Sequence, residues 1–387
     1  MNKTTFFIIN NVISSITGAI NLGICTIFLK NSGYNYAEIS VIFSVILISQ
    51  TVFEYPSGII ADKFGRKKID AIGLLLISFQ YIFYAMNVNL LVMIFAALCG
   101  GIGNALVSGS LEAWLMVDEK DNNILTRCFS LKTSLGTLFS IIITFILAFI
   151  STNFQLMYFS SGFIMLLLSL FTLITYNDNK TNDTEGVIQF NNKAIHEVFT
   201  NKAYVKIILF CSLAFLFYSI FILYWQVRIN EVGISDSNII AVYSLYLIGV
   251  AISSYLVPYI KKTLSNRDYL LLCIVLMTSC FISMRIDNPY FACFGLLLFG
   301  LGFGSMIPYS YAWMAEQIKD ENCATILSFV GSMGTVVSIV GNVIIGVLMD
   351  KFGLNFINTF TIILGILSVS ILVSSKKRSE VNLNKNV

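Results

Sequence analysis

The sequence predicts an all-α polytopic membrane protein whose twelve transmembrane helices form two six-helix bundles. Three observations lead to this prediction: a very apolar composition, twelve apolar stretches of membrane-spanning length, and an internal repeat. Of the 387 residues, 57% are hydrophobic and only 12% are charged, and the mean hydropathy is +0.81. Soluble domains carry about 25% charged residues. A water-exposed fold could not bury this much apolar surface, so lipid must solvate it.

Each apolar stretch is long enough to cross a bilayer as a helix. The spans are expected near residues 6–29, 37–61, 69–87, 90–115, 128–150, 155–176, 204–227, 237–260, 269–286, 290–315, 325–349 and 355–373. The first stretch is too long for the apolar part of a signal peptide and shows no clear cleavage site. We therefore expect it to be retained as a span.

The distribution of basic residues predicts the orientation of the chain. If the N-terminus is cytoplasmic, only four of the 24 Lys and Arg residues fall outside: Lys30, Arg228, Arg285 and Lys351. Basic residues are retained on the cytoplasmic face. We therefore expect a multi-pass protein of the cell membrane with both termini in the cytoplasm.

A long polar stretch divides the chain into two halves. Asn, Asp, Thr and Lys dominate residues 177–203, with six expected spans on each side. This predicts an N-terminal six-helix bundle over 1–176, a cytoplasmic linker over 177–203, and a C-terminal bundle with a cytoplasmic tail over 204–387.

The two halves resemble each other in sequence. At an offset of 199, Gly101 aligns with Gly300 and Gly103 with Gly302, and the match extends through the Ala-Trp pair that begins at Ala113. A weaker match at an offset of 200 relates "NSGYNYAEI" after the first span to "EVGISDSNI" after the seventh. Such repeats indicate two bundles related by an axis along the membrane normal.

A short basic segment between the second and third spans carries the most specific motif. In "GIIADKFGRKK", Gly58, Asp62, Gly65 and Arg66 with the two following lysines match the pattern G-x-x-x-D-x-x-G-R-K-[RK]. That pattern is the signature of the major facilitator superfamily, which the chain resembles over its whole length. "EYPSG" and "SGSLEAWLMVDE" are similar to a branch of bacterial transporters in this family, many of them labelled as efflux proteins.

The resemblance implies that this segment is a conformational latch. Gly58 would let the second span approach another helix closely, and Asp62 would meet the positive N-terminal end of the eleventh span. Arg66 would reach an acid at the end of the fourth span, where Asp118 and Glu119 are available. The alternative is that the basic segment only anchors the topology.

Two acids within the spans are candidates for proton coupling, because a carboxylate inside a membrane is costly. Glu54 lies about 12 Å inside the cytoplasmic edge of the second span, and Glu112 lies about 9 Å inside that of the fourth. Lys132 is at a comparable depth and could pair with Glu112. Either the acids exchange a proton during transport, or Glu112 and Lys132 form a static pair. In the second half Tyr311 replaces Glu112, so helix packing alone does not demand an acid there.

Spans one, four, seven and ten line the central cavity in proteins of this family. Their polar and aromatic residues here are Asn21, Asn104, Tyr218, Tyr224, Gln226, Tyr309 and Tyr311. None of these candidates is a Lys or Arg, which argues against a strongly anionic substrate. An uncharged or amphipathic organic molecule suits them better, although aromatic residues at helical spacing also serve packing.

The expected function is secondary active transport of a small organic solute by alternating access, with protons as the coupling ion and efflux as the direction. Uptake of a nutrient stays open, because an arginine before the glycines of span four and a proline in span five, both frequent in proton-coupled drug antiporters, are absent. A membrane-embedded enzyme or receptor is a remote alternative. We expect a monomer with no cofactor, no metal and no nucleic-acid partner, since the eight cysteines form no CxxC pair and His196 is the only histidine.

Overall fold

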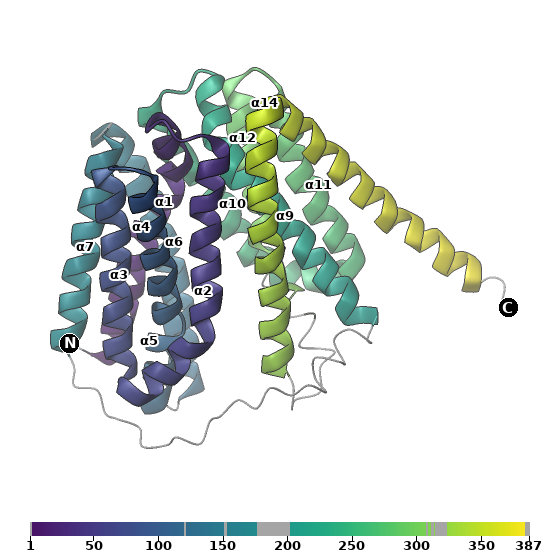
Figure 1. Cartoon of the computed structure of the whole chain (residues 1–387). Helices are drawn as coiled ribbons and strands as arrows, with labels where there is room; N and C mark the ends of the chain where they lie inside the picture. The colour runs from purple at the N-terminus through teal and green to yellow at the C-terminus, as the bar shows by residue number, and fades with distance from the viewer. Residues whose placement is uncertain are drawn as a thin grey trace. The chain divides into compact units, whose positions relative to one another are not determined.

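The computed structural model covers the whole chain and describes residues 2–119, 121–150, 153–175, 202–306, 309–310, 313 and 323–383. Most of the predicted linker 177–203 lies outside the described residues, and α9 begins at Lys202. Every regular element in the described part of the chain is a helix (Figure 1). The helices are α1 Lys3–Asn31, α2 Tyr36–Phe64, α3 Arg66–Met86, α4 Leu90–Val107, α5 Ser110–Asp118, α6 Asn122–Ile150, α7 Phe154–Thr175, α9 Lys202–Glu231, α10 Asp236–Thr263, α11 Asn266–Arg285, α12 Pro289–Gly304 and α14 Cys323–Leu383.

The described helices confirm the predicted all-α membrane fold. Ten segments are long and apolar enough to cross a membrane, and α12 is a shorter apolar helix. One of the ten, Gly331–Ser370, has 40 residues and covers the eleventh and twelfth predicted spans. The backbone of Gly353 interrupts α14 with a φ of 78° and a ψ of 173°, which places a break between these two spans.

Polar residues begin several of the helices at the positions the sequence leads one to expect. Asn35 and Glu38 form a reciprocal capping box at the start of α2. The side chains of Asn89 and Ser265 accept backbone N–H groups at the starts of α4 and α11. Asn288 does the same for α12, whose first residue is a proline. These caps satisfy backbone donors that would otherwise lack partners.

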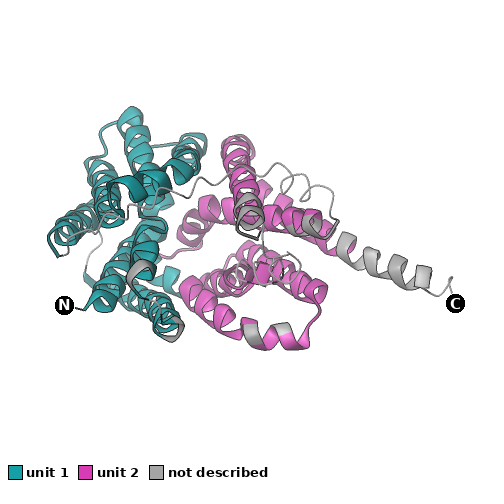
Figure 2. Cartoon of the chain, turned by 90° about the horizontal axis from the view of Figure 1, so that it is seen from below, with its two compact units in different colours: residues 1–190, 235–244 teal, residues 191–234, 245–387 magenta. Residues whose placement is uncertain are grey.

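The described chain separates into two compact units (Figure 2). Unit 1 comprises residues 1–190 and 235–244, and unit 2 comprises residues 191–234 and 245–387. In unit 1, α3 packs between α4 and α7, α2 packs on α4, and α1 packs on α6. In unit 2, α11 packs on α12, and α14 packs on both α9 and α11.

The glycines of the sequence repeat make equivalent contacts inside the two units. A Cβ on Gly101 would lie 2.4 Å from the carbonyl oxygen of Ile46, and one on Gly300 would lie 2.3 Å from that of Tyr246. Likewise, a Cβ on Gly103 would meet the carbonyl oxygen of Gly73 at 2.7 Å, and one on Gly302 would meet that of Cys273 at 2.9 Å. The contacted residues are themselves 200 positions apart. The repeat is therefore one of three-dimensional contacts as well as of sequence.

The weaker sequence match also corresponds to a shared structure. The Tyr34 amide donates to the Leu29 carbonyl and the Gly33 amide to the Lys30 carbonyl, which is a Schellman turn. The same pair of bonds recurs 200 residues later, from Ile234 to Ile229 and from Gly233 to Asn230. Both glycines have a positive φ, 94° for Gly33 and 97° for Gly233, which favours glycine at each turn.

The basic segment between α2 and α3 is shorter than the loop that the sequence suggested. Helix α2 continues to Phe64 and α3 begins at Arg66, so Gly65 alone separates them. Its φ of 103° lies in the region that glycine tolerates best. A second interruption falls within the fourth span, where Ser108 and Gly109 separate α4 from α5 and Gly109 has a φ of 74°.

Candidate functional site

The residues of the predicted latch lie at the junction of α2 and α3. The guanidinium of Arg66 binds Asp62 through Nε and Nη2, both 2.9 Å from Asp62 Oδ1. The Asp62 side chain is 55% exposed, so this ion pair adds little to stability. The pairing of Arg66 with Asp62 was not expected from the sequence. The side chain of Asp118, one of the two acids expected to bind Arg66, lies outside the described residues.

Gly58 makes no close helix contact among the described residues. A Cβ on Gly58 would meet nothing within 4 Å among the described residues. The close approaches in unit 1 occur instead at glycines of α3 and α4, such as Gly73 and Gly101. The signature glycine is thus exposed on α2.

One lysine of the basic segment is buried. Lys67 is 1% exposed, and its Nζ donates to the carbonyl oxygen of Leu173 at 3.3 Å. Leu173 lies in the last turn of α7, where the helix dipole favours a cation. Lys67 therefore ties the start of α3 to the end of α7.

Glu112 and Lys132 form the ion pair that the sequence suggested as one alternative. Lys132 Nζ donates to Glu112 Oε1, and the two side chains are 27% and 25% exposed. Lys132 also lies 5.5 Å from the ring centroid of Phe7, within cation–π range. The pair joins α5 to α6 in a partly buried position.

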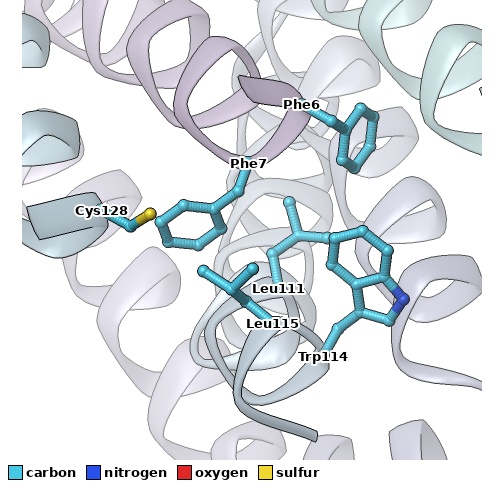
Figure 3. Packing of buried hydrophobic residues seen from close by; sticks show 6 residues of the cluster. All are labelled: Phe6, Phe7, Leu111, Trp114, Leu115 and Cys128. Carbon is cyan, nitrogen blue, oxygen red and sulfur yellow. The ribbon is translucent and has the colours of Figure 1, made fainter. Parts of the chain in front are cut away.

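A hydrophobic cluster fixes α5 in place beside this pair (Figure 3). It consists of the buried side chains Phe6, Phe7, Leu111, Trp114, Leu115 and Cys128, contributed by α1, α5 and α6. The rings of Phe6 and Trp114 meet edge to face at 5.7 Å. The short helix α5 is thereby packed against α1 and α6, which positions Glu112 next to Lys132.

Glu54 differs from the burial expected for it. Its side chain is exposed on α2. The acid that is buried in unit 1 is Asp70, on the second turn of α3. It is 0% exposed, and neither carboxyl oxygen has a hydrogen-bond partner among the described residues. Sequence reasoning missed Asp70 because it directly follows the basic segment, where a charged residue suggests the membrane surface.

The residues predicted to line a cavity are largely engaged inside their own units. Tyr158 donates to Asn21 at 3.0 Å, which links α7 to α1. Asn358 donates to the Tyr224 hydroxyl at 2.6 Å, and the Tyr309 hydroxyl donates to Asn266 at 2.6 Å. These hydrogen bonds give the three candidates a role in helix packing.

The remaining cavity candidates are in different environments. The ring of Tyr218 is half-buried and stacks on Phe303 with centroids 4.6 Å apart. Gln226 is fully buried and Asn104 is half-buried. Tyr311 lies outside the described residues.

A charged cluster at the end of α9 was not singled out from the sequence as a site. Arg228 donates to the carbonyl oxygen of Met284 at 2.8 Å and to Asp287 Oδ1 at 2.5 Å, and it also contacts Glu231 at 3.3 Å. The hydrogen bond and the charge of Arg228 hold the pKa of Asp287 below its ordinary value. The cluster ties α9 to the connection between α11 and α12.

Within the described ranges, no group of three His, Cys, Asp or Glu side chains could hold a metal ion.

The family profile described as Major Facilitator Superfamily matches residues 6–284 and 207–386. The chain belongs to the Major Facilitator Superfamily. This confirms the resemblance drawn from the signature between the second and third spans. Members of this family are multi-pass membrane transporters.

Individual relatives are distant. The chain is 22% identical over 344 residues to "Uncharacterized MFS-type transporter YxaM" of Bacillus subtilis (strain 168), with 85% of each chain covered. It is 20% identical over 295 residues to "Quinolone resistance protein NorA" of Staphylococcus aureus (strain COL), with 76% of each chain covered.

Solved structures confirm the fold of this superfamily member. The nucleoside transporter NupG superposes with a TM-score of 0.84 at 13% identity, covering 97% of this chain and 99% of that one. A bacterial homologue of the human lysosomal transporter Spinster, in an inward-facing and occupied conformation, gives a TM-score of 0.78 at 10% identity, covering 97% and 96%.

Proposed function

We propose that the protein exports a small, uncharged or amphipathic organic molecule across the cell membrane and draws its energy from a proton gradient. The observation that carries the proton part is the pair Glu112–Lys132. The pair is only partly buried, with each side chain about one-quarter exposed, so it is not closed off inside unit 1. Glu54, exposed on α2, is proposed as a second acid in the same exchange.

The similarity to the NorA proteins favours export. Their name associates them with quinolone resistance, and quinolones are therefore the first compound class to test. The cavity candidates contain no Lys or Arg, which favours an uncharged or amphipathic molecule over a strongly anionic one. Nutrient uptake is the competing direction.

We further propose that Gly58, Asp62, Gly65, Arg66 and Asp118 act as a conformational latch. Gly65 supports this role because it makes a one-residue hinge between two long helices. The exposed pair Asp62–Arg66 can exchange partners at little energetic cost. In the proposed cycle these groups make and break contacts as the transporter alternates between its two open states.

The proposed topology places both termini, residues 62–68 and the linker 177–203 in the cytoplasm, and the protein acts as a monomer. Single cysteines introduced into a cysteine-free variant and labelled in whole cells with an impermeant reagent test this arrangement. Labelling is expected for a cysteine in the turn after Asn31. Labelling of a cysteine within 177–203 would instead show that the chain has the opposite orientation.

The transport proposal is tested with purified protein in proteoliposomes, assayed with and without an imposed pH gradient. A substrate screen that starts with quinolones should find a compound whose movement requires the gradient and runs opposite to the protons. Movement in the same direction as the protons would identify an importer. A transport rate that is the same with and without the pH gradient would refute proton coupling.

A further inference from the structure

Asp70 is a buried acid whose surroundings do not neutralise it. It lies about 6 Å along α3 from Arg66, at 1.5 Å per residue. The side chain is fully buried, and among the described residues neither of its oxygens accepts a hydrogen bond. An ionised carboxylate without partners is far more costly to bury than a neutral carboxyl group. This packing therefore suits the protonated form.

The charged groups that act on Asp70 come from two other helices. They are Glu112 on α5 and Lys132 on α6, and the polar side chain that acts on Asp70 is Asn10 on α1. Asn10 is itself buried and donates its amide to Thr172 Oγ1 on α7 at 2.9 Å. Asn10 thus connects α1 to α7.

Among the described side chains of α2, α3, α4 and α7, the other charged groups are exposed or bound elsewhere. Helices α4 and α7, which pack on α3, contain no Asp, Glu, Lys or Arg at all. On α2, Glu54, Asp62 and Lys63 are exposed. On α3 itself, Arg66 binds Asp62, Lys67 donates to the end of α7, and Lys68 is exposed. Asp70, Glu112 and Lys132 therefore form a set of two carboxyl groups and one ammonium group.

The second unit shows that the fold does not need this acid. Because Gly73 and Cys273 receive equivalent glycine contacts, α3 and α11 correspond at an offset of 200. At that offset Asp70 corresponds to Leu270, which is 5% exposed. An apolar side chain thus fills the equivalent position in unit 2, and the carboxyl group in unit 1 calls for an explanation other than packing.

We propose that Asp70 is the residue that stores the transported proton, and that Glu112 and Lys132 connect it to water. This inference rests on the proton coupling proposed above. In the conformation described, Asp70 is a carboxylic acid and the Lys132 ammonium neutralises the Glu112 carboxylate. When Lys132 turns from Glu112 to Asp70, the proton passes from the Asp70 carboxyl oxygen to a Glu112 carboxylate oxygen. The total charge of the set stays constant during this transfer. Glu112, which is 25% exposed, then releases the proton to water, and the charge of the set falls by one.

Difference infrared spectroscopy of the purified protein tests the storage site without a substrate, because the probe is pH alone. Wild type should show the C=O stretching band of a protonated carboxyl group at neutral pH. That band should disappear in Asp70→Asn, which keeps the side-chain volume, and persist in the matched control Asp121→Asn, an exposed Asp between α5 and α6. A wild-type spectrum whose band does not change in Asp70→Asn would overturn the assignment.

Two further variants keep the proposal testable if Asp70→Asn folds poorly. In Glu112→Gln the freed Lys132 should pair with Asp70, so the Asp70 band should be lost at neutral pH. In Lys132→Met no ammonium remains, so the band should persist to higher pH than in wild type. If the Asp70 band is the same in both variants as in wild type, Asp70 and Glu112 do not compete for Lys132, and this part of the proposal is refuted.

Coupling to the transport cycle is tested by the distance between spin labels placed on Lys68 and Lys262 of a cysteine-free variant, measured across pH. The distance distribution should change with pH in wild type and become independent of pH in Asp70→Asn. A pH response that survives in Asp70→Asn would refute storage at Asp70 while leaving proton-driven transport intact. Conversely, transport that ignores a pH gradient would refute the coupling even if the Asp70 infrared band were present.

Discussion

Removing Lys132 alone should cost more stability than removing it together with Glu112. The Glu112–Lys132 pair is 25% and 27% exposed, between a surface pair and a buried one. Exposed pairs contribute about 0.2–1 kcal/mol, whereas losing one partner of a buried pair costs about 3–5 kcal/mol. For Lys132→Met we expect a loss of roughly 2–3 kcal/mol, because the Glu112 carboxylate is left without its cation in a site that is three-quarters buried.

The double change Glu112→Gln with Lys132→Met should recover most of that loss, because no unpaired charge remains. For a unit of this size, about 2–4 °C in melting temperature corresponds to each kcal/mol. The single variant should therefore melt roughly 4–12 °C below wild type, and the double variant close to it. Thermal unfolding of the detergent-purified protein measures this difference, with size-exclusion chromatography used to monitor the folded fraction that remains after heating.

The same double variant separates a structural pair from a proton carrier. If Glu112 carries the proton, Glu112→Gln should abolish transport driven by a pH gradient while leaving substrate binding largely intact, and the double variant should stay inactive although it is stable. Recovery of gradient-driven transport in the double variant would refute the role of Glu112 in coupling. A double variant as unstable as the single one would refute the ion-pair argument itself.

Three other predictions concern the helix contacts, the latch and the charged cluster of unit 2. Gly101→Ala should destabilise the protein by about 1–3 kcal/mol through overpacking against α2. Gly18→Ala, whose added Cβ would meet no described residue within 4 Å, should be neutral in the same thermal assay. Equal melting temperatures would contradict the close approach at Gly101. Asp62→Asn should slow transport in proteoliposomes greatly with little loss of folded protein, and a normal rate would reduce the basic segment to a topology anchor. Because Arg228 lowers the pKa of Asp287, their ion pair stabilises the fold at pH values above 3.8, the ordinary pKa of an aspartate. That contribution is lost as the pH falls through the lower folded-state pKa. Asp287→Asn should therefore be less stable than wild type at pH 7, and a pH series should show the difference shrinking in acid.

The fold was predictable because its main signals are local. A membrane helix needs about 20 apolar residues in a row, and those runs are visible without knowing which helices touch. The repeat was visible for the same reason, since Gly101 and Gly300 lie in similar short segments. Single-residue breaks were harder to place: the sequence suggested a loop around Gly65, but the helices continue to its immediate neighbours.

The environment of each acid was less predictable, because burial depends on how helices rotate about their axes. Their similar depth along the spans predicted similar environments for Glu54 and Glu112, yet Glu54 is exposed and Glu112 is paired with Lys132. Asp70 sits at the edge of its span in sequence, but α3 turns it into the interior of unit 1. The pairing of Glu112 with Lys132 was suggested by matching depths on consecutive helices, which is information that a sequence does contain.

The comparison of the two units separates what the fold requires from what the chemistry requires. Both units use glycines at equivalent positions to bring helices into contact, and both end their first helix with the same turn. The charged groups do not follow the repeat: Leu270 stands at the position of Asp70, and Tyr311 at that of Glu112. Features needed for packing should recur in both units, whereas a proton path is needed only once per transporter. The acids confined to unit 1 are therefore the residues for which a role in proton exchange explains more than a role in packing.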